Sequence, residues 1–160
     1  MRILFFVLGF LATLTLAAAQ RSPSITGPFQ LTVSADHAVV PSGQHIWVRV
    51  LMKNISNGNV DCSKTYSNGI NLQFRFIIHA PDGNVIEKKQ VPHPELEDAA
   101  SFTPCTLAQN QSTEAEDNLI NRRFDMSLPG EYTIQVERGI SANEKDGFVK
   151  SNKITITVTQ

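Results

Sequence analysis

The chain has 160 residues, of which 41% are hydrophobic and 18% are charged, and its formal net charge is −1. This near-neutral balance argues against a nucleic-acid or anionic-membrane partner, because such partners require clustered Lys and Arg. The basic pairs Lys88-Lys89 and Arg122-Arg123 each have an acidic residue nearby, which is typical of an ordinary solvated surface.

Residues 1–19 have the pattern of a secretory signal peptide. Arg2 supplies a positive charge, residues 3–16 are almost purely apolar, and Ala17 and Ala19 are small residues in the positions that signal peptidase requires. About fourteen residues span roughly 21 Å as a helix, less than a hydrocarbon core of about 30 Å. We therefore favour a signal peptide over an anchoring or buried helix, and we predict a secreted or periplasmic protein without an integral membrane segment.

Cleavage before Gln20 would leave 141 residues with 13 basic and 15 acidic side chains, a net charge of −2. This length is sufficient for one domain with a substantial core. Residues 20–28 are rich in Pro, Gly and Ser and are predicted to be a flexible leader. The folded domain is expected to comprise residues 29–160.

The first half of this domain alternates apolar and polar residues with a period of two, which is typical of strands with one buried face. Strands are predicted at 29–35, 44–54 and 70–79. The second of them places four apolar side chains on one side, namely Ile46, Val48, Val50 and Met52. Its other side includes Trp47 and Leu51, which suggests a central position in the sheet.

The sequence Pro-Asp-Gly-Asn at 81–84 predicts a tight turn, because Gly83 tolerates the positive φ that such turns require. This turn is expected to join strand 70–79 to a further strand at 84–91 as a hairpin.

Three more strands are predicted in the second half, at 112–120, 131–137 and 153–159. No window outside the signal peptide shows the spacing of an amphipathic helix. About seven strands at this spacing predict an all-β fold, a single immunoglobulin-like sandwich of antiparallel strands with Greek-key connections.

Cys62 and Cys105 both lie in connections between predicted strands, in a chain expected to reach an oxidising compartment. Two cysteines allow a single intramolecular pairing, so a disulfide between them is favoured. Two free thiols, or one catalytic cysteine near a histidine, are the alternatives.

The motifs that carry enzyme chemistry are missing from the sequence. There is no HExxH, Cys-x-x-Cys, Gly-x-Ser-x-Gly, Walker motif or dinucleotide fingerprint. The four histidines are scattered, and the sharpest metal candidate, the acidic stretch 93–98, is more typical of a solvated loop. We therefore expect neither an enzyme nor a bound metal or cofactor.

Residues 30–159 also carry a resemblance to known sandwich domains. It rests on Val-Pro-Ser-Gly-Gln at 40–44, on Phe-Asp-Met-Ser followed by Pro-Gly-Glu-Tyr-Thr at 124–133, and on Lys-Ser-Asn at 150–152. The chain resembles the immunoglobulin-like accessory domain that precedes the catalytic domain in bacterial deuterolysin-type peptidases. More loosely, it is similar to the BsuPI-type proteinase-inhibitor sandwich. The resemblance implies the fold and no catalysis, because the peptidase domain and its zinc motif are absent.

These observations predict a secreted, non-catalytic binding module whose partner is a protein. The stretch 92–104 contains three prolines and no periodicity, and long loops without structure of their own are often functional. The candidate contact residues in it are His93, Glu95, Leu96 and Phe102. A proteinase inhibitor acting through this loop and a structural component of the cell envelope are alternatives, and the sheet edges are a second place for a partner.

Overall fold

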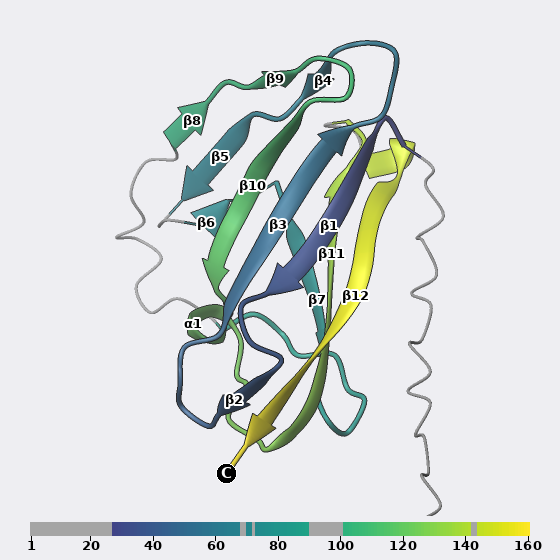
Figure 1. The fold of residues 1–160 in the computed structure, drawn as a ribbon. Coiled ribbons are helices and arrows are strands. Elements are labelled where there is room, and N and C mark those ends of the chain that lie inside the picture. Colours follow the sequence, from purple (N-terminus) through teal and green to yellow (C-terminus); the bar gives the residue numbers. More distant parts are fainter. Residues whose placement is uncertain (1–26, 68–69, 72, 90–100, 142–143) are drawn as a thin grey trace, which may run out of the picture.

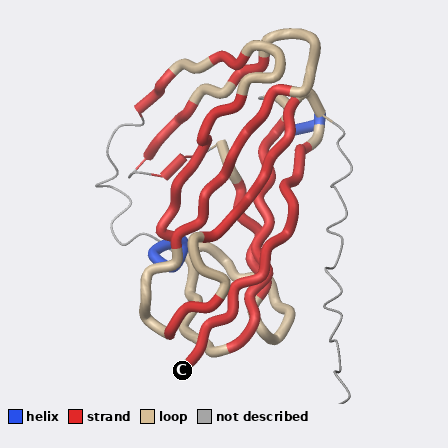
Figure 2. Tube along the Cα trace, in the orientation of Figure 1, coloured by secondary structure: helices blue, strands red, loops and turns tan. Residues whose placement is uncertain are grey.

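The computed structural model describes residues 27–67, 70–71, 73–89, 101–141 and 144–160 (Figure 1). Strands dominate these residues, and helix is limited to the single turns α1 (Ile120–Arg123) and η2 (Glu144–Asp146) (Figure 2). The predicted signal peptide 1–19 and most of the predicted leader 20–28 lie outside the described residues.

Two sheets pack face to face and form a sandwich (Figure 1). The first has the order β1-β3-β10, with bounds Phe29–Ala35, Trp47–Asn54 and Ser112–Leu119. The second has the order β2-β12-β11-β7, with bounds Val39–Pro41, Phe148–Thr159, Gly130–Gly139 and Arg75–His79. The prediction of an all-β sandwich is confirmed. One detail differs, because β2 pairs with β12 in parallel rather than antiparallel orientation.

Five short strands extend the sandwich beside β10 (Figure 1). They form a pair, β4 (Val60–Asp61) with β9 (Thr106–Leu107), and a three-stranded sheet in the order β6 (Ile70–Asn71), β5 (Lys64–Ser67), β8 (Ser101–Thr103). Strands of two to four residues give too few alternations for a period of two to be recognised. This explains why the sequence did not predict them as separate strands.

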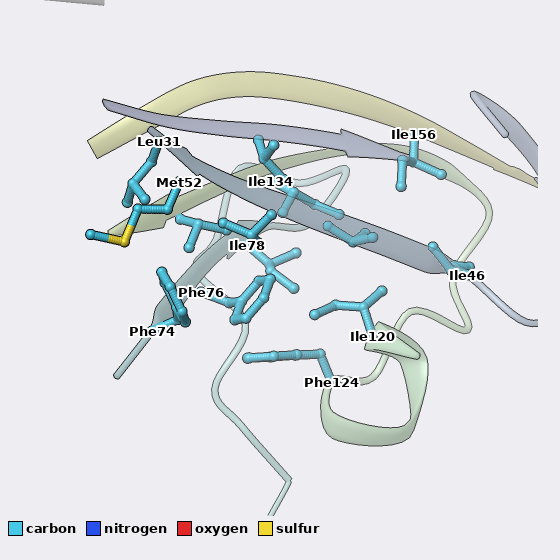
Figure 3. Packing of buried hydrophobic residues seen from close by; sticks show 14 of the residues in the cluster. Leu31, Ile46, Met52, Phe74, Phe76, Ile78, Ile120, Phe124, Ile134 and Ile156 are labelled. Atoms are coloured by element: carbon cyan, nitrogen blue, oxygen red, sulfur yellow. The ribbon is translucent and has the colours of Figure 1, made fainter. Parts of the chain in front are cut away.

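The core lies between the two sheets, where the alternating apolar residues meet. Figure 3 shows Met52, Ile78 and Ile134, from strands of both layers, pointing into this space. Ile120 and Phe124 cover one end of it. The four inward residues predicted between positions 46 and 52 are all buried. The strand that carries them is central in its sheet, as predicted, although its outer face is solvated.

The prediction of one strand at 70–79 is wrong, and the predicted hairpin forms only next to its turn, where His79 pairs with Val85 in antiparallel orientation. β6 and β7 belong to different sheets, and between 84 and 89 the chain makes only isolated pairings, at Val85 and at Lys88. The turn itself forms as predicted, with Gly83 at a φ of 84°. In this stretch only Ile86 packs against the core, and Val85 is exposed. A segment with so few inward apolar side chains has little to hold it as a continuous strand.

A tyrosine fixes the corner that leads into β11. Tyr132 is 1% exposed, and its hydroxyl donates a hydrogen bond to the Leu128 carbonyl oxygen at 2.7 Å. This bond to a carbonyl a few residues upstream is a hallmark of immunoglobulin-like sandwiches. Burial also raises the pKa of the Tyr132 phenol, which therefore stays a donor at neutral pH.

β12 contains a bulge that changes how it meets its neighbours. The ladder with β11 shifts register between Gln135 and Glu137, so Ser151 and Asn152 together stand opposite Val136. The Ser151 hydroxyl accepts a hydrogen bond from the Val136 amide at 2.9 Å. The amide therefore keeps a partner even though the regular ladder is interrupted.

The side chain of Asn152 uses this bulge to join the two sheets. Its Nδ2 donates to the Val33 carbonyl oxygen at 3.0 Å, and its Oδ1 accepts from the Val33 amide at 2.8 Å. Val33 lies in β1, an edge strand whose outward backbone groups would otherwise lack partners inside the protein. The side-chain amide of Asn152 thus makes the two hydrogen bonds that the backbone of a neighbouring strand would otherwise make to Val33.

We predict that Asn152→Ala lowers the free energy of unfolding by about 1–3 kcal/mol, because it leaves two backbone groups without partners. Urea unfolding followed by tryptophan fluorescence measures the loss. Thr155→Ala is the matched control, since Thr155 is exposed on the same strand. Equal urea midpoints for the two variants would contradict the role of Asn152 in joining the two sheets.

Candidate functional site

The inner face of β11 ends in a charged residue. Tyr132, Ile134 and Val136 alternate inward and are almost fully buried, and the same alternation carries Arg138 to 5% exposure. Side chains along a strand point to opposite faces in turn, so a residue in phase with the core faces inward whatever its charge. Arg138 therefore lies at the end of the sandwich interior.

Three groups from distant parts of the chain surround the Arg138 guanidinium. Its Nη2 donates to Asp61 Oδ2 at 3.2 Å and to the Ser63 carbonyl oxygen at 3.4 Å. Its Nη1 lies 3.2 Å from Met52 Sδ, which is a weak acceptor. The Asp61 side chain is 68% exposed, so this ion pair has one buried and one solvated member.

Two aromatic rings complete the surroundings of this cation. Arg138 Cζ lies 5.8 Å from the centre of the Phe29 ring and 5.5 Å from the centre of the Phe74 ring, which is cation–π distance. Burial lowers the pKa of the Arg138 guanidinium, and the Asp61 carboxylate acts in the opposite direction. An arginine nevertheless remains protonated in proteins. The end of the sandwich therefore contains a permanent, largely desolvated positive charge.

The disulfide holds the acidic partner in place. Cys62 and Cys105 are bonded, with their Cα atoms 4.8 Å apart, so the predicted pairing is confirmed and both alternatives with free thiols are wrong. The Cys62 amide also donates to the Cys105 carbonyl oxygen at 3.0 Å, and the Cys105 amide donates to Ser63 Oγ at 3.1 Å. Asp61 and Ser63, which flank Cys62, are thereby fixed beside Arg138.

A cavity of about 390 Å³ opens at this point. Its lining includes Arg138 with Asp61, and apolar side chains from Phe29, Phe102 and Ile140. The volume falls within the range of about 300–1,000 Å³ that is typical of small-ligand sites. A buried cation beside apolar walls gives this cavity both an orienting group and a surface for hydrophobic contact.

A second hollow, of about 560 Å³, lies along β1 and β12. It is lined mainly by small and hydroxyl-bearing residues, and Lys153 is the one charged side chain among them. Because it lacks a buried charged group, it has fewer groups that could orient a ligand than the cavity at Arg138 has.

Of the predicted contact residues, only Phe102 can be placed. It is 64% exposed on β8 and lines the cavity. The other candidates, His93, Glu95 and Leu96, lie outside the described residues. The end of the expected loop 92–104 forms β8, which corrects the prediction that the whole stretch is irregular.

Sequence reasoning missed Arg138, because the predicted strand ended at Glu137. Extending the same alternation by one residue would have placed an arginine in phase with the core. Within the described residues, no group of three or more His, Cys, Asp or Glu side chains is arranged to hold a metal ion. The same residues include no helix with the length and hydrophobicity needed to cross a membrane.

Comparisons with known proteins give similarity at the level of solved structures. No family model matches the sequence, and no curated protein matches it either. The CARDB domain of the PF1109 protein from Pyrococcus furiosus, solved in complex with di-metal ions, is 12% identical with a TM-score of 0.44. That alignment covers 82% of this chain and 87% of the other.

The C-terminal domain of wzt is 12% identical, with a TM-score of 0.38 and coverage of 84% of this chain and 75% of that one. The ZirS C-terminal domain is 11% identical, with a TM-score of 0.29 and coverage of 98% and 88%. At these TM-scores the similarities assign neither a family nor a function. The resemblance to deuterolysin-type accessory domains and to the BsuPI-type sandwich therefore stays a prediction.

We predict that the double variant Cys62→Ala, Cys105→Ala loses about 4 kcal/mol of unfolding free energy, because the disulfide closes a loop over a sequence separation of 43 residues. Urea unfolding with and without reductant measures this loss. Reductant should lower the midpoint of the wild-type protein and leave the double variant unchanged. If the urea midpoint of the wild-type protein stays the same after complete reduction of the disulfide, the prediction is contradicted.

Proposed function

We propose that the mature chain is an exported, non-catalytic β-sandwich that binds a protein partner at the end where Arg138 is buried. The observation that supports this most strongly is the cavity, which combines that cation with the exposed ring of Phe102. Binding sites are typically apolar hollows with a few placed polar groups, and exposed aromatic side chains are common anchors in interfaces.

The polar contacts at the cavity favour binding over catalysis. Ser63 Oγ accepts a hydrogen bond from the Cys105 amide, and Asp61 is engaged with Arg138. None of the described residues that line the cavity is a histidine or a cysteine thiol. A serine nucleophile is commonly activated by a histidine, whereas Ser141, the second serine of the lining, donates its hydroxyl to the Asp146 carboxylate at 2.5 Å.

Export is the second part of the proposal. The apolar run at 3–16 with its small-residue cleavage site motivates it, and the disulfide is typical of oxidising compartments. The narrower hypothesis of a proteinase inhibitor uses the same end of the molecule, since the stretch 92–104 ends in β8. A structural role in the cell envelope is the remaining alternative.

We predict that the exported protein begins at Gln20, because Ala17 and Ala19 form the cleavage signal. Intact-mass measurement of protein recovered from outside the cytoplasm checks this directly. A variant with Ala19→Arg should accumulate as the uncleaved precursor. Recovery of a wild-type chain that retains residues 1–19 would refute the prediction.

Site-specific photo-crosslinking tests the binding surface. A photoreactive amino acid replaces Phe102 in one variant and Leu128 in another, and both are exposed to the secreted fraction of the producing cells. The two side chains are matched controls, with exposures of 64% and 62%. Phe102 lies on β8, whereas Leu128 precedes the start of β11, which is at the other end of the sandwich in Figure 1. We expect defined adducts with a protein from position 102 alone. Adducts from position 128 alone, or identical adducts from both, would contradict the proposed surface.

A further inference from the structure

The contacts of Arg138 leave its ability to bind a carboxylate only partly used. An arginine offers five N–H donors in a planar fork, and it binds carboxylates most strongly through two parallel hydrogen bonds. Asp61 contacts this fork through Oδ2 only, at 3.2 Å, because its Oδ1 accepts from the Ser63 amide at 3.1 Å. The internal ion pair is therefore monodentate, with one carboxylate oxygen in contact, rather than bidentate.

Asp61 is also the more easily displaced member of the pair. Its side chain is 68% exposed, whereas that of Arg138 is 5% exposed. Water can solvate a carboxylate that moves away, whereas the guanidinium stays largely buried at the wall of the cavity. Any incoming anion that enters the cavity meets a cation whose desolvation has already occurred on folding, which strengthens their attraction.

The walls of the cavity restrict what accompanies the anion. Phe29, Phe102 and Ile140 provide apolar surface next to the cation. The rings of Phe29 and Phe74 already lie at cation–π distance from the guanidinium, so an incoming acceptor has to approach it from the side of the cavity. A small inorganic anion would leave the apolar walls uncovered, whereas a carboxylate attached to an apolar group would cover them.

We infer that this cavity binds a carboxylate attached to an apolar group, which replaces Asp61 as the partner of Arg138. This inference rests on the proposed function, and a protein partner supplies such a group at a C-terminus that ends in an apolar residue. Asp61 then acts as an internal substitute for the ligand. It keeps the buried cation paired while the cavity is empty.

The test is an NMR titration of the mature protein with N-acetylphenylalanine and, separately, with its uncharged primary amide. The acid should shift the backbone amides of Ser63 and of residues 139–141, and the amide should bind at least about tenfold more weakly, since it lacks the charge. Equal affinity for the two compounds would overturn the inference.

Two variants with the same change of charge separate ligand displacement from general electrostatics. Asp61→Asn removes the internal competitor and should tighten acid binding severalfold. Asp36→Asn, at the far end of β1 and in an ion pair with Arg49, should leave the affinity unchanged. Weaker acid binding by Asp61→Asn would show that Asp61 is part of the ligand site, which contradicts its role as a substitute.

Arg138→Met should weaken acid binding by about tenfold or more, because one charge-assisted contact is lost. If this variant fails to fold, the comparison of acid with amide and the Asp61→Asn result still decide the question. Phenylacetate tests the other source of the same chemistry, and binding more than tenfold tighter than that of N-acetylphenylalanine would contradict a chain-terminal ligand. Crosslinking at position 102 without any acid-dependent shift would refute this inference and leave the proposed function standing.

Discussion

The bulge at Ser151 and Asn152 determines how the two sheets meet, and the candidate site depends on it. By leaving the ladder, Asn152 becomes free to bond both backbone groups of Val33 and so fastens β1 to the edge of β12. Phe29 begins the same strand, where it pairs with Asn54 of β3. The ring of Phe29 can then lie over Arg138, which is carried by a different sheet. Two inter-sheet hydrogen bonds near the middle of the fold thus hold the strand whose first residue forms an aromatic wall at the end of the sandwich.

Two consecutive charged residues are buried on opposite faces of β11. Glu137 is 1% exposed on the outer face, where it forms ion pairs with Arg75 and Lys150, both largely exposed. Arg138 is buried on the inner face and contacts a single carboxylate. Burying a charge costs several kcal/mol, and a well-packed apolar residue is often as stable in such a place. Packing alone therefore does not explain an arginine at this position, whereas the inferred binding of a carboxylate accounts for it.

The remaining parts of the cavity come from two long connections that the disulfide ties together. One connection, between β3 and β7, supplies Asp61 and Ser63, and the other, between β7 and β10, supplies Phe102. Neither connection has enough apolar residues of its own to form an independent core. Their short strands pair with one another and lie against the sandwich, which gives β8 a defined place beside the cavity. The same arrangement explains why the stretch 92–104 was predicted as loop but ends in a strand.

The sequence by itself determined the strands that became β1, β3, β10, β11 and β12, the turn at Gly83 and the single disulfide. Each of these follows from local geometry or from the number of available partners. Tertiary structure alone decided that 70–79 divides between two sheets, that β2 pairs in parallel with β12, and that Asp61, Phe102 and Arg138 meet. The physical reason is that periodicity reports which face of its own strand a side chain occupies. It carries no information about which distant strand lies opposite that face, and this depends on long-range packing and on the bulge that sets the register.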